Sequence, residues 1–231
     1  MFRFTLAFLV VSAASALHAQ EGVGLGLVGK IEGGRTYVSP TGQFKVAIPV
    51  LPELGGDITD TPNVVTFQDD FNVHVSIATF PQDATQRWEL STRGLKDYLI
   101  YFFSNFVLSD FKQTFEGVQI ESAKFLPGTL DGALLTYILI PGGTMFADRV
   151  PQIGMSNRIP IAKRGNLLFV RNGHIFVLST ELAERVIEGK AYSKTTEQED
   201  ELLRTRLNDI ASKIQFAKPA STPAAKETAK K

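Results

Sequence analysis

The sequence predicts an α+β fold in which an antiparallel β-sheet carries helices on both faces, an α/β/α sandwich. Two observations lead to this prediction. Several expected strands are apolar at consecutive positions, so both sides of these strands must be shielded from water. Two other segments have apolar residues at helical spacing. Helices are therefore the elements expected to cover the sheet.

The segment 166–181, NLLFVRNGHIFVLSTE, is the clearest predicted hairpin. Asn172 and Gly173 accept the positive φ angles that a type I′ turn requires. The flanking runs, Leu167 to Val170 and Ile175 to Leu178, do not alternate between apolar and polar residues. We therefore expect the sheet that contains this hairpin to be covered on both faces.

Two further hairpins are expected at the start of the folded region, which begins at Arg35. Each has apolar or alternating runs around a turn rich in Pro, Gly, Asp or Asn. The expected strand pairs are 36–38 with 44–48, and 64–67 with 73–80. The stretch 49–63 is rich in Pro, Gly and Asp and is expected to be an irregular connection.

A long helix is predicted from Ser91 to Phe111, because its apolar residues recur at the spacing of a helix that packs on a sheet. These residues are Leu95, Tyr98, Leu99, Phe102, Phe103 and Phe106. Strands are expected again at 118–125 and 133–140. The second of these is apolar on both faces apart from Thr136 and the Tyr137 hydroxyl, and we place it beside the Asn-Gly hairpin.

The last regular element is a predicted helix from about Glu197 to Ile214. Thr196 and Glu199 are expected to form its capping box. Its apolar residues form one narrow seam, which suits a helix lying on one face of the sheet. They are Leu203, Leu207, Ile210 and Ile214.

The first 19 residues have the layout of a secretory signal peptide. One basic residue, Arg3, precedes an apolar run at 4–11 and small residues at 12–16. This run is shorter than the roughly 20 residues needed to span a bilayer. Cleavage after Ala16 satisfies the preference for small residues, and cleavage after Ala19 is the alternative. A periplasmic or secreted protein is therefore expected.

Composition supports one principal domain with a sizeable core. The chain has 231 residues, and removal of the leader leaves 23 basic against 24 acidic groups. This balance argues against nucleic acid as the main partner. Cysteine is absent, so disulfides and a lipoprotein anchor are excluded. We expect a signal peptide at 1–19, a Gly-rich linker at 20–34, one domain at 35–217 and a disordered tail at 218–231.

Three segments, in this order, resemble the PsbP-like α/β/α sandwich family. They are YVSPTGQFKVAIP, VVTFQDDFNVHVSIATFP and NLLFVRNGHIFVLSTE, and the resemblance extends over roughly 37–216. This fold is shared by the photosystem II extrinsic protein PsbP, a Ran-binding nuclear import factor and exported bacterial proteins. The resemblance implies a docking or accessory module rather than an enzyme, and no cofactor is expected.

Several motifs were weighed as sites of chemistry. Gly24 to Gly29 matches the dinucleotide fingerprint in letters only, since no strand precedes it and no helix follows. Asp69, Asp70 and His74 could offer ligands to a cation. However, Asp residues are also common in turns, and a single turn rarely supplies enough ligands for a metal site. His174 is interpreted as a solvated residue beside a turn. The segment 154–158, GMSNR, lacks the second Gly of a nucleophile elbow.

The segment 142–164, GGTMFADRVPQIGMSNRIPIAKR, is the candidate interaction surface. It is longer than most unstructured connections, yet it mixes apolar and cationic residues. One interpretation is that it covers the sheet edge or the core. The other is a docking surface for a protein or an anionic envelope component. The expected contact residues are Met145, Phe146, Arg149, Ile153, Met155, Arg158, Ile161 and Arg164.

The resulting hypothesis is an exported, non-enzymatic binding or accessory module. The alternative is a small-molecule or lipid carrier with a pocket beneath the aromatic helix, lined by Phe102, Phe103 and Phe106. Such a pocket would measure roughly 300 Å³ or more. A hydrolase with a spatially assembled site is the third possibility, because paired carboxylates cannot be recognised from their spacing in sequence.

Overall fold

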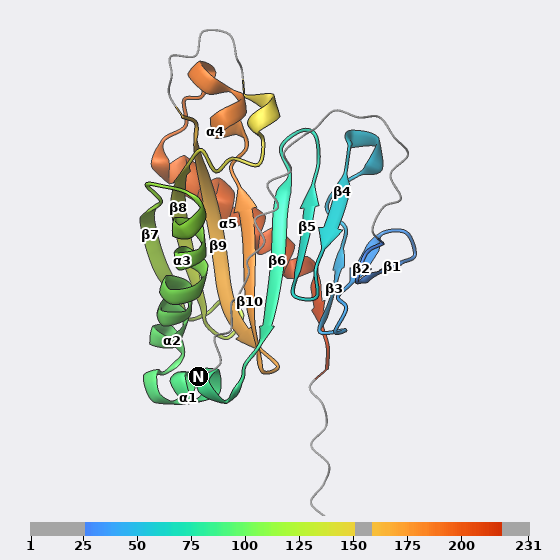
Figure 1. The fold of residues 1–231 in the computed structure, drawn as a ribbon, viewed down its shortest axis with the longest axis vertical. Helices are drawn as coiled ribbons and strands as arrows, with labels where there is room; N and C mark the ends of the chain where they lie inside the picture. The colour runs from blue at the N-terminus through green and yellow to red at the C-terminus, as the bar shows by residue number, and fades with distance from the viewer. Residues whose placement is uncertain (1–25, 151–158, 219–231) are drawn as a thin grey trace, which may run out of the picture.

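The computed structural model describes residues 26–150 and 159–218, and these form two antiparallel sheets with helices (Figure 1). The larger sheet has seven strands in the order β4-β5-β6-β10-β9-β8-β7. Their bounds are β4 Asp57–Asp60, β5 Val64–Gln68, β6 His74–Pro81, β10 His174–Glu181, β9 Ile161–Arg171, β8 Ala133–Pro141 and β7 Gln119–Leu126. The smaller sheet consists of β1 Lys30–Glu32, β2 Thr36–Val38, β3 Phe44–Ala47 and β11 Ile214–Phe216.

One face of the large sheet is covered by three consecutive helices and a π-helical turn. They are α1 Ala84–Arg93, α2 Leu95–Phe102, the π turn Phe103–Val107 and α3 Leu108–Thr114. Their buried side chains, such as Tyr98, Leu99 and Phe102, pack with Leu168 and Val177 of the central strands. This is the aromatic stripe expected from the sequence. Its apolar residues exclude water from that face of the sheet.

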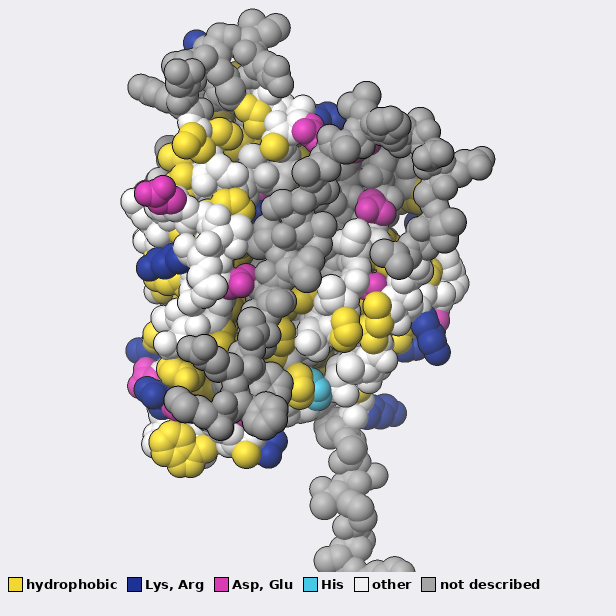
Figure 2. All heavy atoms as spheres, in the orientation of Figure 1, with side chains coloured by type: hydrophobic (Ala, Val, Ile, Leu, Met, Phe, Trp, Pro, Cys, Tyr) yellow, Lys and Arg dark blue, Asp and Glu magenta, His cyan; other side chains and the backbone are white. Residues whose placement is uncertain are grey.

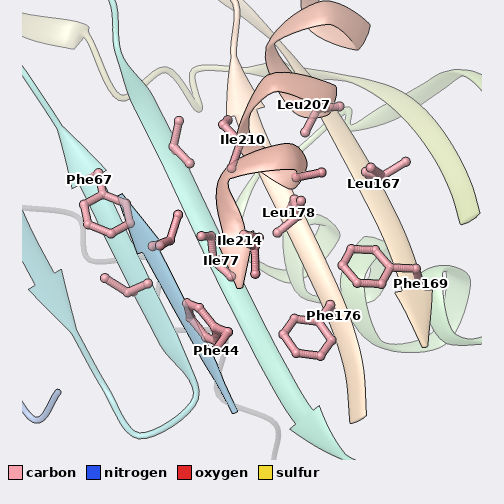
Figure 3. Close-up of a cluster of buried hydrophobic side chains, with 14 of the residues drawn as sticks. Phe44, Phe67, Ile77, Leu167, Phe169, Phe176, Leu178, Leu207, Ile210 and Ile214 are labelled. Atoms are coloured by element: carbon pink, nitrogen blue, oxygen red, sulfur yellow. The ribbon is translucent and has the colours of Figure 1, made fainter. Parts of the chain in front are cut away.

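The other face is covered by helix α5, Thr196–Lys213, together with the smaller sheet. Figure 3 shows Leu207 and Ile210 of α5 over this face, with Leu167 and Leu178 of the large sheet in the same cluster. Phe44 of β3 belongs to this cluster as well, and its ring centroid lies 6.0 Å from that of Phe176. Helix α5 and the small sheet therefore both shield this face from water.

The predicted antiparallel α+β sandwich is confirmed, with one difference in its second layer. The α5 seam is narrow, so it covers only part of a seven-stranded face. The rest is covered by β2 and β3, extended by β11, which pairs with β3 through Ile214 opposite Val46. The sequence predicted the hairpin formed by β2 and β3, but it did not predict that this hairpin belongs to a second sheet.

Two edge strands lie in stretches for which no strand was expected. Strand β1 falls within the glycine-rich stretch 20–34, and β4 falls within the stretch 49–63. Asp60 of β4 connects these two stretches. Its carboxylate accepts hydrogen bonds from the backbone N–H groups of Val28 and Gly29, at 2.8 and 2.7 Å, and from the Tyr37 hydroxyl at 2.8 Å. The predicted signal peptide lies outside the described residues, as does the predicted tail from residue 219 onwards.

The predicted continuous helix over 91–111 is wrong in its boundaries and continuity. Helix α1 begins earlier, where the Asp83 side chain accepts the backbone N–H of Gln86 at 2.7 Å. It ends at Gly94, whose φ of 76° is readily adopted only by glycine. A new helix, α2, starts there, and the five-residue π turn then separates α2 from α3. The aromatic face remains continuous across these breaks.

The predicted capping box of the last helix is wrong by one residue. Thr195 and Gln198 form the box, with the Thr195 hydroxyl accepting from the Gln198 backbone and the Gln198 side chain accepting from the Thr195 backbone. Glu199 instead points inward and is 1% exposed. Its carboxylate is bound by Arg185 and Lys163, so tertiary ion pairs take the place of local capping.

Candidate functional site

A groove of about 560 Å³ lies at the end of the large sheet where β5 turns into β6, and we call it the β5–β6 groove. This is the upper end in Figure 1, where α4 (Glu184–Ile187) and the 3-10 turn Ala147–Arg149 also lie. Figure 2 shows hydrophobic and acidic side chains near one another at this end. The groove is lined by Pro49, Leu51, Leu54, Asp69, Phe71, Asn72, Val73, Arg149, Glu184, Ile187 and Glu188.

The turn between β5 and β6 is fixed by Asp69. One oxygen of its carboxylate accepts the backbone N–H groups of Phe71, Asn72 and Val73, each at 2.9 Å. These bonds hold the turn in a single conformation, as Asp side chains commonly do. Phe71, in the middle of the turn, is left 50% exposed. The turn therefore presents an aromatic ring at the groove.

A second wall comes from the 3-10 turn Pro52–Leu54. Pro at its first position fixes φ, and Gly55 closes it in the left-handed region at φ 70°. The Asp70 N–H donates to the Leu54 carbonyl at 3.1 Å and ties this wall to the β5–β6 turn. Leu51 and Leu54 are 42% and 40% exposed. Apolar side chains from two separate segments thus meet at one opening.

The third wall is formed by Arg149 and helix α4. The Arg149 guanidinium lies over the Phe71 ring, 5.7 Å from its centroid, in a cation–π contact. The Glu184 carboxylate accepts from Asn72 at 3.2 Å and from Arg206 at 2.5 and 3.2 Å. Burial alone would raise the pKa of Glu184, but the bonds from Arg206 and from its own backbone outweigh it and hold the pKa below its usual range.

These features suit the groove for binding rather than for proton transfer. A carboxylate with a lowered pKa stays ionised, and Glu184 is already paired with Arg206, so it is a poor general acid. Asp69 is committed to its turn. Over residues 26–150 and 159–218, no group of three or more His, Cys, Asp or Glu side chains is placed to hold a metal ion.

A buried charge network lies elsewhere in the domain, around Lys163 of β9. Lys163 is 0% exposed, and its ammonium pairs with Glu199 at 3.1 Å, Asp200 at 2.5 Å and Glu121. Burial alone would lower the pKa of Lys163, but these carboxylates raise it above its usual value. A lysine that stays protonated is no nucleophile, so this network ties β9 to β7 and α5 without offering chemistry.

The structure divides the predicted contact residues of 142–164 between interior and surface. Phe146 is 2% exposed and packs with Ala183 and Val186. Arg164 is 5% exposed; its side chain donates to Glu181 at 3.3 Å and to the Gly143 carbonyl at 2.9 Å. Both side chains therefore pack within the domain. This agrees with the interpretation that the segment covers the sheet edge or the core.

The other predicted contact residues differ in exposure. Met145 is partly buried, and its backbone N–H donates to Glu181 at 3.0 Å. Arg149 is exposed at the groove, and Ile161 is 42% exposed at the start of β9. Ile153, Met155 and Arg158 lie outside the described residues, as does the GMSNR segment. Of the five described residues in this set, Arg149 is the one that lines the groove.

The remaining sequence candidates lie away from the groove. Gly29 ends the glycine motif, and its N–H binds Asp60. The His174 ring lies 3.0 Å from the Asn172 carbonyl. His74 is 4% exposed near Arg164, and among the described residues it forms no metal-binding group with Asp69 and Asp70. Phe102 and Phe103 are each 2% exposed within the packed helix–sheet layer, and neither lines the β5–β6 groove.

Comparisons with known proteins give similarity in fold. The chain is similar to cyanobacterial PsbP (CyanoP) from Synechocystis sp. PCC 6803, with 12% identity over 86% of this chain and 99% of that one, at a TM-score of 0.48. It is also similar to the Ran-binding protein Mog1p of Saccharomyces cerevisiae, with 8% identity over 83% of this chain and 96% of that one, at a TM-score of 0.46. The predicted resemblance named these same two proteins, PsbP and a Ran-binding protein, as members of the PsbP-like fold.

No protein-family model matches the sequence, and a search of curated proteins finds no match. At the identities found for the solved structures, nothing about activity or partners follows from the similarity. Among the described residues, no helix is long and apolar enough to cross a membrane.

The groove itself was missed by the sequence analysis, although two signals for it exist. Phe71 is an aromatic residue inside an otherwise polar turn, Asp69 to Asn72. Leu51 and Leu54 are isolated apolar residues in a Pro- and Gly-rich stretch. Such residues have no periodic pattern, so only the folded chain shows that they meet.

Proposed function

We propose that this protein is an exported, non-enzymatic binding or accessory module that docks to a protein or another envelope component through the β5–β6 groove. The observation that carries the proposal is the exposure of Leu51, Leu54 and Phe71, each 40–50%, around one opening. Apolar side chains that gather at an open surface, with charged groups beside them, are typical of interaction sites. Export rests on the predicted signal peptide at 1–19.

Binding is favoured over catalysis because three of the groove's polar groups are already engaged in structural contacts. Asp69 holds the turn, Glu184 is paired with Arg206, and Arg149 stacks on Phe71. A reaction centre needs titratable groups that converge on a substrate and are free to exchange protons. A docking site needs only a fixed surface, which these contacts provide.

A substitution in the turn tests this proposal. Phe71→Ser removes half-exposed apolar surface, so the fold should be retained while recovery of a bound partner falls strongly. Wild type and variant, without the leader, would be cross-linked in envelope extracts, and the recovered proteins would be compared by quantitative mass spectrometry. Trp88→Ser is the matched control, because Trp88 on α1 is 61% exposed and does not line the groove.

Thermal unfolding of both variants should match wild type within a few degrees, which shows that the fold is intact. Recovery of every partner at the same level by wild type and by Phe71→Ser would refute the groove as the docking site.

A further inference from the structure

We propose that the β5–β6 groove recognises a polypeptide segment in which a Lys or Arg lies next to a bulky aliphatic side chain. This inference rests on the proposed function and specifies the chemistry of the partner. It follows from the charge around the groove, from the contact already made by Phe71, and from the exposure of the apolar rim.

The charge around the groove is predominantly negative. Its lining includes three carboxylates, Asp69, Glu184 and Glu188, and one basic residue, Arg149. Arg206 neutralises Glu184, and Arg149 lies over the Phe71 ring. An excess of carboxylate therefore remains at the groove, although the chain as a whole is neutral. Complementary charge guides association and suppresses partners of the same sign, so a basic segment is favoured.

Glu188 is the carboxylate best placed to contribute. It lines the groove at the end of α4 and is exposed. Within the part of the chain that the structure describes, it has no ion-pair partner, whereas Glu184 beside it is neutralised by Arg206. A Lys or Arg of a docked segment would supply the missing countercharge.

Phe71 provides a second contact for a cation. Its ring already receives the Arg149 guanidinium, 5.7 Å from the centroid. A half-exposed aromatic ring attracts cations on either face, and a partner's Arg or Lys could use the same ring. The aliphatic part of the partner would then lie against Leu51, Leu54 and Ile187.

A polypeptide fits this groove better than a small molecule does. Small-molecule sites bury most of the ligand, and their apolar lining is correspondingly enclosed. Here the three apolar residues of the rim remain 40–50% exposed, so a ligand confined to the groove would leave much of them in water. A polypeptide continues beyond the opening and can cover this rim.

Selection from a random peptide library displayed on phage tests the inference, with the full chain without its leader as the target. We expect the selected peptides to be enriched in Lys or Arg beside Leu, Ile or Phe. A fluorescein-labelled synthetic copy of the most enriched peptide would then be titrated by fluorescence anisotropy. Phe71→Ser and Glu188→Lys should each weaken its binding by about fivefold or more, and Trp88→Ser should leave it unchanged.

Salt dependence separates charge from packing. The effect of Glu188→Lys should shrink as ionic strength rises, because exposed charges are screened, whereas the effect of Phe71→Ser should shrink less. Equal affinity of wild type and Glu188→Lys for the peptide would overturn the inference. Displacement of the peptide by an equal concentration of arginine amide would also overturn it, since the groove would then be a site for a small cation.

Failure of this inference can be told apart from failure of the proposed function. Selected peptides that lack basic residues but are lost in Phe71→Ser would reject the partner chemistry and keep the docking site. If no selected peptide responds to Phe71→Ser, and recovery from envelope extracts is equally unaffected, both proposals are overturned.

Discussion

Single residues link the stability of this domain to pH, and His74 is the clearest case. Burial, and then the charge of Arg164, lowers the pKa of His74 to about 3. His74 is therefore neutral in the folded chain, whereas the same residue binds a proton below about pH 6.5 when the chain is unfolded. Protonation then favours the unfolded state. Stability contributed by the neutral ring is present above about pH 6.5 and is lost as the pH falls toward 3.

Replacing His74 with Leu should reduce this pH dependence. The wild-type melting temperature should fall more steeply than that of His74→Leu between about pH 7 and pH 4, because only the wild type takes up this proton on unfolding. Asp110 works in the opposite direction, since burial raises its pKa to about 6. The difference between the two proteins therefore isolates His74. Parallel curves of melting temperature against pH would contradict the assignment.

At the scale of the elements, strands and helices with a clear sequence pattern were predicted well, whereas edge strands without such a pattern were missed. The Asn-Gly hairpin became β9 and β10, and Asn172 adopts the expected positive φ of 50°. The strand at 133–140 lies beside that hairpin, as placed. Strand β4 carried no such signal, because it is an edge strand in a polar stretch and only one of its side chains, Ile58, is an apolar residue packed against the core.

The candidate site was less predictable than the fold for a related reason. Burial of Phe146 and Arg164 depends on Ala183 and Glu181, which are distant in the sequence. The Arg149 contact with Phe71 likewise joins two segments far apart in the chain. Composition could show that 142–164 mixes apolar and cationic residues, but only tertiary contacts decide which of them remain outside.

A substitution in β3 tests whether the small sheet shares a core with the large sheet. Phe44 is 1% exposed and packs between the Phe176 and Tyr37 rings, at centroid distances of 6.0 and 6.2 Å. Phe44→Ala should therefore lower the free energy of unfolding by about 3–5 kcal/mol, the usual cost of removing a buried Phe. Chemical denaturation measures this value.

Trp88→Ala is the control for that measurement, because an exposed side chain should change the free energy of unfolding by less than about 0.5 kcal/mol. A similarly small effect of Phe44→Ala would mean that the small sheet does not share the core of the large one.

For the whole molecule, the covered faces of the large sheet leave its ends as the places for recognition. Helices α1 to α3 shield one face, while α5 and the small sheet shield the other. Groove residues come from four separate segments that meet at one end. A docked partner would therefore contact a surface fixed by the same core that stabilises the fold, so binding requires little reordering of the domain.

Such a partner would be met outside the cytoplasm if the first 19 residues act as a signal peptide. Expression of the full chain in a bacterial host should then yield a shortened protein in the periplasmic fraction or the medium. Its first residue should be Leu17 after cleavage at Ala16, or Gln20 after cleavage at Ala19. Intact-mass measurement and N-terminal sequencing distinguish the two sites.

Substitution of the apolar run provides the control for export. Leu9→Arg places a charge in the centre of the run, where an export signal must be hydrophobic, so the chain should stay inside the cell at full length. Because this change lies within the leader, the mature domain is the same in both proteins. Retention of the wild-type chain in the cytoplasm with Met1 in place would refute export, and a partner would then have to be sought inside the cell.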